Sequence, residues 1–224
     1  MSALGGRVGV FGSLFDPPHV GHLILCAEAV DQLRLDRVLL VPTGSPAHRP
    51  AAAEPGDVRL RLAAAAASTD PHVFVSRTEL DRPGPSYMVD TLRELGRQYP
   101  GRELVLLLGA DQLARLGDWH EATQIPRLAS IAVAPRPGVT LRGLDRTRVE
   151  RIEMPLVDVS STALRARVAA GRSIRHLVPE PVRLLVEAEG LYRRVATAAV
   201  PPEARPHGVL AWDEVFPPSR SSAD

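Results

Sequence analysis

Two histidines three residues apart are the side chains near the start of the chain that could do chemistry together. His19 and His22 end the segment GSLFDPPHVGH at residues 12–22, and Gly21 between them has no side chain to block an anion. Side chains at this spacing share one face of a helix, and the first turn of a helix leaves N–H groups unpaired at the positive end of the dipole. Imidazoles there can donate hydrogen bonds to phosphate oxygens. The segment therefore predicts a phosphate-binding site at a helix start.

A second polar group stands near the carboxyl-terminal end, in the segment VSSTALR at residues 159–165. Ser160, Ser161 and Thr162 are typical of a helix N-terminus, where hydroxyl groups and unpaired N–H groups form an anion site. Arg165 follows one turn later and can reach the same side. Alone, the segment is also typical of an ordinary capped helix. Together, the two segments offer two helix starts, two imidazoles and a guanidinium to a single polyphosphate.

Other interpretations of the histidine segment are weaker. It could be a structural helix start that leaves both histidines facing solvent. A metal site would need a third ligand from far away, because H-x-x-H supplies only two, so we expect no protein-bound metal. The segment also lacks the G-x-x-x-x-G-K-[ST] pattern of a Walker loop and the G-x-G-x-x-G pattern of dinucleotide-binding folds.

The elements that would position these residues alternate between strand and helix. Short apolar runs predict strands at residues 7–11, 37–41, 73–76, 103–108 and 131–134. Helical spacing and capping residues predict helices at residues 20–33, 57–68, 86–98, 160–170 and 181–189. The alternation predicts an α/β fold, a Rossmann-like doubly wound parallel sheet with helices on both faces. Ligand sites of such sheets lie at the carboxyl ends of strands, so we expect the site in the loops after residues 11, 41 and 108 and before residue 160.

Composition limits the function classes. The chain has 224 residues, of which 45% are apolar and 24% charged, an ordinary globular composition. Its 27 basic and 26 acidic residues give a net charge of +1, so we expect no nucleic-acid partner and no membrane partner. Cys26 is the one cysteine, which excludes an internal disulfide and indicates a reducing compartment. We expect a cytoplasmic protein, since no apolar stretch approaches the ~18 residues of a membrane span and no signal-peptide pattern is present.

The HxGH tetrapeptide after a strand and the SSTxxR element resemble signatures of the nucleotidylyltransferase superfamily. Three further segments, at residues 41–49, 84–92 and 109–119, narrow the resemblance to the bacterial nicotinate-nucleotide adenylyltransferases. It implies a nucleotidylyltransferase domain over residues 1–195. The Pro- and Ala-rich residues 196–224 are expected to form a poorly ordered tail.

The resemblance also implies roles for individual residues. The catalytic residues that it implies are His19, His22 and Arg165. The ATP-binding residues that it implies are Gly12, Ser13, Phe15, Gly21, Gly109, Asp111, Ser160, Ser161 and Thr162. The mononucleotide-binding residues that it implies are Thr43, His48, Arg49, Tyr87, Met88 and Trp119. Met88 departs from the family, which usually has threonine there, so the preference for an acid or an amide on the pyridine ring stays open.

The implied reaction transfers AMP from ATP to nicotinate mononucleotide, giving nicotinate adenine dinucleotide (deamido-NAD) and diphosphate in NAD biosynthesis. Phosphate is a competent nucleophile at neutral pH, so the reaction needs no general base. Mg²⁺ is expected to travel with ATP, bound mainly by phosphates and water. Alternatives are another acceptor, nicotinamide mononucleotide or phosphopantetheine, or a non-catalytic nucleotide-binding module. The sequence leaves open whether the protein forms a homo-oligomer.

Overall fold

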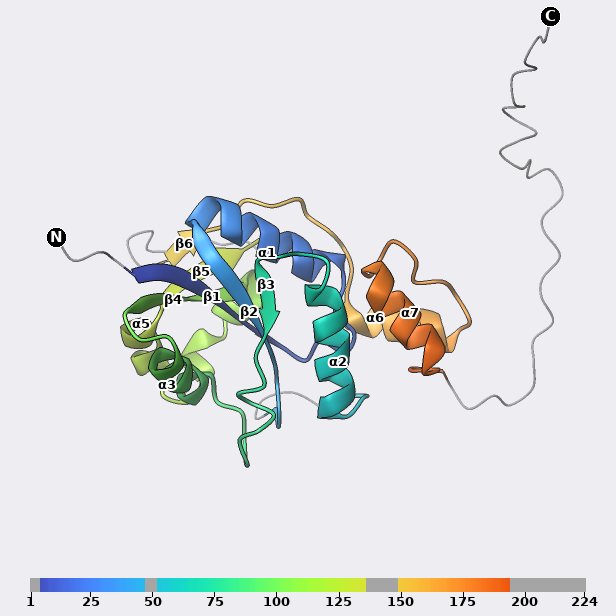
Figure 1. The fold of residues 1–224 in the computed structure, drawn as a ribbon, viewed down its shortest axis with the longest axis horizontal. Helices are drawn as coiled ribbons and strands as arrows, with labels where there is room; N and C mark the ends of the chain where they lie inside the picture. The colour runs from blue at the N-terminus through green and yellow to red at the C-terminus, as the bar shows by residue number, and fades with distance from the viewer. Residues whose placement is uncertain (1–4, 47–51, 136–148, 194–224) are drawn as a thin grey trace, which may run out of the picture. The chain divides into compact units, whose positions relative to one another are not determined.

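The computed structural model describes residues 5–46, 52–135 and 149–193 of the chain. The strands within these ranges are β1 (Gly5–Ser13), β2 (Leu35–Pro42), β3 (Val73–Val75), β4 (Arg102–Gly109), β5 (Ser130–Ala134) and β6 (Val149–Arg151). They pair in parallel, in the order β3-β2-β1-β4-β5-β6 (Figure 1). The order reverses between β1 and β4, which confirms the predicted doubly wound sheet.

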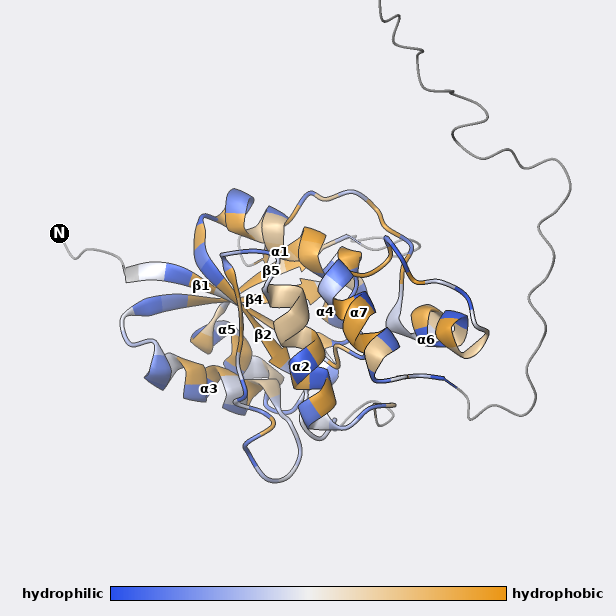
Figure 2. Ribbon diagram, turned by 45° about the vertical axis from the view of Figure 1, so that its right-hand side comes forward, coloured by the Kyte–Doolittle hydropathy of each residue, from blue (hydrophilic) through white to orange (hydrophobic). Residues whose placement is uncertain are grey.

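Nearly continuous apolar runs explain why these strands form a parallel sheet. Residues 38–42 of β2 and residues 104–108 of β4 are buried without interruption. Successive side chains of a strand point to opposite sides, so such strands must be covered on both faces. Figure 2 shows the apolar strands running through the middle of the molecule, between the helices.

Helices supply that cover. α1 (Val20–Leu33) and α2 (Gly56–Ala67) share a buried apolar cluster with one face of the sheet. α3 (Met88–Gln98) and α5 (Ile125–Leu128) share a second cluster with the other face. The predicted cover of helices on both faces is therefore confirmed.

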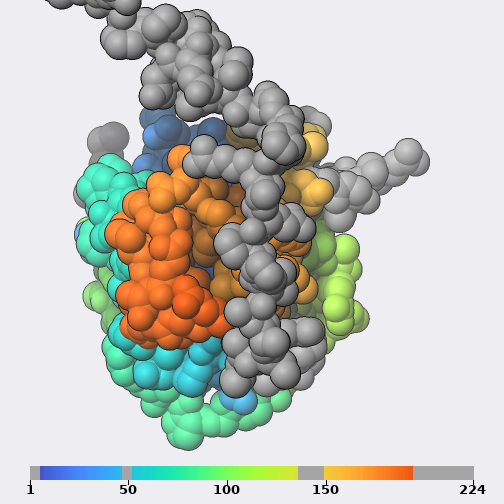
Figure 3. All heavy atoms as spheres, turned by 90° about the vertical axis from the view of Figure 1, so that its right-hand side faces the viewer, coloured from blue at the N-terminus to red at the C-terminus, as the bar shows by residue number. Residues whose placement is uncertain are grey.

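A third apolar cluster attaches the last two helices to the side of α2. α6 (Ser161–Ala169) and α7 (Glu180–Ala188) contribute Leu164 and Val182, which are buried together with Leu62 of α2. Figure 3 shows α7 lying directly against α2. This packing holds the carboxyl-terminal helices close to the loop that leaves β1.

Short elements differ from the sequence prediction. The sequence does not predict β6, α5, α4 (Ala110–Leu113), η1 (Leu116–Asp118) or η2 (Ala122–Gln124). Elements of three or four residues are too short to show an apolar period, and β6 reads Val-Glu-Arg with two charged residues. α3 begins at Met88 rather than at residue 86.

The strand reversal decides where a ligand can bind. The loops that leave β1 and β4 run in opposite directions from adjacent strands, and a crevice opens between them at the carboxyl edge of the sheet. One compact unit, Met1–Arg193, contains all of the elements above. The predicted domain boundary at residue 195 and the predicted tail at residues 196–224 lie outside the described residues. No helix in the described ranges is long and apolar enough to cross a membrane.

Candidate active site

The two histidines lie at the start of α1 and touch each other. Their rings stack with centroids 3.7 Å apart and planes 21° apart, and His19 is only 5% exposed. The main-chain N–H of His19 donates to Nδ1 of His22 at 3.0 Å. A neutral His22 ring therefore carries its proton on Nε2, which makes Nε2 a hydrogen-bond donor. Two cationic rings this close would repel each other, so a bound anion is what would stabilise the charged pair.

Two phenylalanines fix the ring of His22. Phe15 meets it edge-on at 5.2 Å between ring centroids, and Phe11 lies at 5.5 Å. The Phe15 side chain is fully buried, in a residue with φ of 51°. It supports the histidine from behind, so a contact between Phe15 and ATP would have to come from its main chain.

The start of α6 lies against the loop that leaves β1, although the two are more than 140 residues apart in the chain. The hydroxyl of Ser161 donates to the carbonyl oxygen of Pro17 at 2.8 Å. Nη1 of Arg165 donates to the carbonyl oxygen of Asp16 at 2.8 Å. Ser160 caps the helix by accepting from the main-chain N–H of Ala163 at 3.2 Å. The structure thus brings the two predicted anion-binding segments together.

Two clefts open at the carboxyl edge of the sheet. The first, the phosphate cleft, is lined among others by Ser13, His19, Gly21, His22, Gly109, Asp111 and Val159. The second, the ring pocket, is lined by Thr43, Pro46, Glu79, Ser86, Tyr87, Met88, Arg115, Asp118, Trp119 and His120. Gly12 and Gln112 line both clefts, so the two meet over the strand reversal between β1 and β4.

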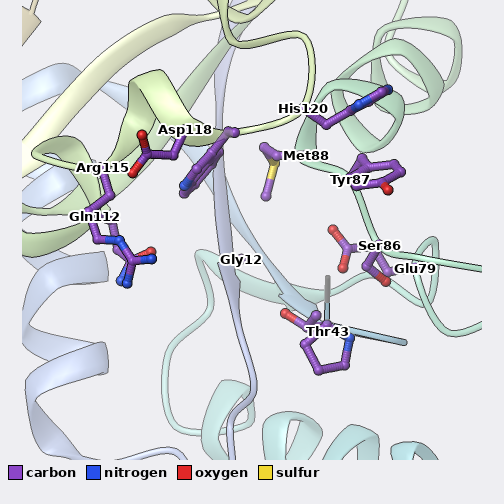
Figure 4. A pocket seen from close by; sticks show the side chains of 12 residues that line it. Gly12, Thr43, Glu79, Ser86, Tyr87, Met88, Gln112, Arg115, Asp118 and His120 are labelled. Carbon is purple, nitrogen blue, oxygen red and sulfur yellow. The ribbon is translucent and has the colours of Figure 1, made fainter. Parts of the chain in front are cut away.

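Figure 4 shows how the ring pocket is assembled from separate elements. Gln112, Arg115 and Asp118 lie on one side, and Glu79, Ser86 and Tyr87 lie on the other. The ring of Tyr87 stacks on the ring of His120, with centroids 4.2 Å apart. Aromatic faces of this kind suit a flat heteroaromatic ligand.

Glu79 is a member of the ring pocket that the sequence does not reveal. It is only 3% exposed, and the hydroxyl of Thr91 donates to its Oε1 at 2.8 Å. Burial raises the pKa of the Glu79 carboxyl above its ordinary value, while hydrogen bonds from Thr91 and Ser86 act in the opposite direction. Its main-chain oxygen lies 2.2 Å from where a Cβ on Gly44 would stand, so a larger residue at that position would push the loop after β2 away.

The predicted residues divide between the clefts as follows. Thr43, Tyr87, Met88 and Trp119 line the ring pocket. Ser13, His19, Gly21, His22, Gly109 and Asp111 line the phosphate cleft, and Gly12 lines both. Ser160, Ser161, Thr162 and Arg165 line neither cleft; they lie at the start of α6, where Ser161 and Arg165 contact the loop that leaves β1. His48 and Arg49 lie outside the described residues.

Four further residues line the site without being predicted from the sequence: Gln112, Arg115, Asp118 and His120. They belong to the short helices after β4 and to the turn that follows, whose positions depend on packing rather than on a local pattern. Among the described residues, no group of three His, Cys, Asp or Glu side chains could hold a metal ion.

A family model and the curated relatives of the chain indicate the same family. A family model described as Cytidylyltransferase-like matches residues 10–167. The chain is 42% identical over 186 residues to a protein of Exiguobacterium sibiricum named "Probable nicotinate-nucleotide adenylyltransferase", a match that covers 83% of this chain and 98% of that protein. It is 43% identical over 187 residues to a protein of Thermus thermophilus with the same name, covering 84% of this chain and 100% of the relative.

Solved structures agree at the level of the fold. The structure titled Plasmodium falciparum nicotinic acid mononucleotide adenylyltransferase complexed with NaAD superposes with a TM-score of 0.69 at 13% identity, covering 84% of this chain and 97% of the other. Identity this low shows a common fold alone. Given its curated relatives, which match more than four fifths of its length, the chain belongs to the nicotinate-nucleotide adenylyltransferases of the Cytidylyltransferase-like family.

Proposed function

We propose that the protein transfers the AMP group of ATP to nicotinate mononucleotide, forming nicotinate adenine dinucleotide and diphosphate. The observation that carries this proposal is the meeting of the two clefts at Gly12 and Gln112. One cleft offers a histidine pair beside a helix start, and the other offers aromatic faces. Two substrates that each end in phosphate can therefore approach the same point from opposite sides. The names of the curated relatives favour the same reaction.

Each cleft suits one substrate. The ring pocket takes the pyridine ring between the aromatic side chains of Tyr87 and Trp119, with the 5′-phosphate directed toward Gly12. The phosphate cleft takes the triphosphate of ATP at the start of α1. The start of α6 and Arg165 lie beside this cleft and hold the β- and γ-phosphates.

The chemistry is an in-line displacement at phosphorus. An oxygen of the mononucleotide phosphate forms a bond to the α-phosphorus, and the bond from that phosphorus to the bridging oxygen breaks, so diphosphate leaves with the electron pair. His19 and His22 donate hydrogen bonds to the oxygens on which negative charge develops. Mg²⁺ enters with ATP as part of the substrate and neutralises phosphate charge. The buried free thiol of Cys26 favours a reducing compartment, and we place the reaction in the cytoplasm.

A panel of acceptors tests the proposal directly. Purified protein with ATP and Mg²⁺ is given nicotinate mononucleotide, nicotinamide mononucleotide or phosphopantetheine, and diphosphate release is measured. We expect the highest kcat/KM with nicotinate mononucleotide. A higher value with either of the others would reassign the acceptor, and ATP binding without turnover on any acceptor would favour a non-catalytic module.

Replacing one histidine tests the assignment of the phosphate cleft. His22→Ala removes the Nε2 donor, and we expect kcat to fall by ~10²-fold or more because that donor acts on charge developed in the transition state. The matched control is His72→Ala, which removes an exposed histidine next to β3, at the edge of the sheet. The control should keep the wild-type kcat. Near-normal turnover by His22→Ala would refute the assignment.

A further inference from the structure

A buried carboxylate lies directly behind the phosphate cleft, although it lines neither cleft. Asp16 is 1% exposed and sits in the loop that leaves β1. Its Oδ2 accepts from the main-chain N–H of Ala53 at 2.6 Å. Its Oδ1 accepts from the hydroxyl of Tyr192 at 2.8 Å, across 176 residues of sequence. Two neutral donors therefore occupy the two oxygens of a charged group.

Arg165 lies beside this carboxylate without forming a close pair with it. Nη1 of Arg165 is 3.9 Å from Oδ2 of Asp16, but it donates to the main-chain oxygen of the same residue at 2.8 Å. Nη2 points to the hydroxyl oxygen of Thr162 at a longer distance of 3.4 Å. The guanidinium is thus anchored by one nitrogen at the loop, while its other side faces the first turn of α6.

Loss of the Tyr192 hydroxyl would remove the hydrogen bond that it donates to Oδ1 of Asp16. A buried carboxylate oxygen without a donor is unfavourable and turns toward the nearest cation that can move. Arg59 is 2% exposed and already interacts electrostatically with Asp16, and its Nη1 and Nε donate to the carbonyl oxygens of Leu14 and Glu54 at 3.0 and 3.1 Å, which hold it in place. Arg165, with 29% of its side chain exposed, has the freedom to swing into a direct pair with Asp16.

We propose that Tyr192 is a positioning residue for adenylyl transfer, which keeps the Asp16 carboxylate occupied so that Arg165 stays available to the triphosphate of ATP. This inference rests on the proposed function, because it takes a triphosphate as the ligand beside α6. It assigns a role to the turn after α7, which forms no part of either cleft.

The conformation of Tyr192 fits a residue held in place by its side chain. Its φ of 63° lies in the left-handed region, which bulky residues rarely adopt. Burial and the adjacent negative charge of Asp16 raise the pKa of the Tyr192 phenol well above its ordinary value. The phenol therefore remains a protonated donor throughout the pH range in which the enzyme would work.

The test is a double-variant cycle read by calorimetric titration of the full chain with ATP and Mg²⁺. For Tyr192→Phe, we expect affinity for ATP to fall roughly tenfold, the size of one charge-assisted hydrogen bond. The KM for nicotinate mononucleotide should stay within about twofold of wild type. Asp16→Asn alone should bind ATP at least as well as wild type, since the main-chain oxygen that holds Arg165 is kept.

The decisive variant combines both changes. A neutral asparagine cannot draw Arg165 away, so Tyr192→Phe with Asp16→Asn should restore ATP affinity to within about twofold of Asp16→Asn. A purely structural role of Tyr192 predicts the opposite, since two lost interactions would weaken binding further. The matched control is Tyr99→Phe, which removes a phenol hydroxyl after α3, at the cluster on the other face of the sheet. It should leave ATP affinity unchanged.

Three results would overturn the inference. In the first, Tyr192→Phe binds ATP with an affinity within twofold of wild type. In the second, the double variant binds ATP more weakly than Tyr192→Phe does. In the third, Asp16→Asn alone loses affinity for ATP. The last measurement does not depend on whether Tyr192→Phe folds. Wild-type protein that binds ATP but transfers nothing to any acceptor would count against the proposed function, while the affinity comparison would still decide the role of Tyr192.

Discussion

The substitution Gly12→Ala adds one methyl group and should affect the stability of the fold far less than the rate of the reaction. Gly12 lies near the end of β1 and lines both clefts. A Cβ at this position would stand 2.6 Å from Cε of Met88, the far end of a flexible side chain. Rotating that terminal methyl away costs ~0.5–1.5 kcal/mol, and replacing a strand glycine with alanine returns ~0.5–1 kcal/mol. Gly12→Ala should therefore fold with a stability within ~1 kcal/mol of wild type.

The effect on activity should be far larger. The added methyl group would occupy the point where the two clefts meet, and thus where the mononucleotide phosphate must approach the α-phosphorus. A displacement of about 1 Å in a reacting group can cost ~10²-fold in rate, which corresponds to ~2.7 kcal/mol of activation free energy. We expect kcat/KM of Gly12→Ala to fall by at least that factor.

Two measurements on each variant check this prediction. Thermal melting should place Gly12→Ala within roughly 4 °C of wild type, and diphosphate release should show the loss of activity. The control is Gly96→Ala, in an exposed part of α3 where an added Cβ meets no atom within 4 Å. The control should keep full activity and melt slightly higher, because alanine is the better helix former. If Gly12→Ala kept kcat/KM within about threefold of wild type, the reacting phosphates would not meet over Gly12.

Two further predictions concern the body of the fold. Burial strongly raises the pKa of the Cys26 thiol, so this thiol should resist a thiol reagent in the native protein and react only after denaturation. If the native protein reacted at the rate of free cysteine, Cys26 would not be buried. Hydrogen bonds from the Arg7 guanidinium and the Ser130 hydroxyl lower the pKa of the Glu103 carboxyl. The folded protein therefore binds fewer protons at Glu103 than the unfolded chain does. The resulting stability is fully present above about pH 4.5 and is lost as the pH falls through the lowered pKa. The melting temperature of Arg7→Gln should thus lie below that of wild type at pH 6 and approach it near pH 3, and a gap that stays constant over this range would contradict the assignment.

Local chemistry explains why much of the site could be predicted from the sequence. A helix start is marked by the residues next to it, so His19, His22 and Ser160 could be placed on first turns without knowledge of the fold. The main strands are buried on both faces and therefore appear as uninterrupted apolar runs. Their alternation with helices then places the loops after β1, β2 and β4 at one edge of the sheet.

The parts that the sequence does not reveal depend on contacts between distant segments. Asp and Glu are mostly exposed in proteins, so nothing in the sequence marks Asp16 and Glu79 as buried. Their partners, Tyr192 and Thr91, become evident only when the chain is folded. The same holds for the stack of Tyr87 on His120, which joins the start of α3 to the turn after η1.

The loop that leaves β1 shows why the anion site needs more than its own residues. Carbonyl oxygens carry partial negative charge and would repel a phosphate if they faced it, and the two prolines of this loop have no N–H groups to compensate. Donors from other helices hold three of these carbonyl groups: Arg59 at Leu14, Arg165 at Asp16 and Ser161 at Pro17. Because these donors come from α2 and α6, the HxGH segment could not form the same anion site in a chain that lacked those helices. A resemblance that extends over nearly the whole chain is therefore a stronger indication of function than the tetrapeptide alone.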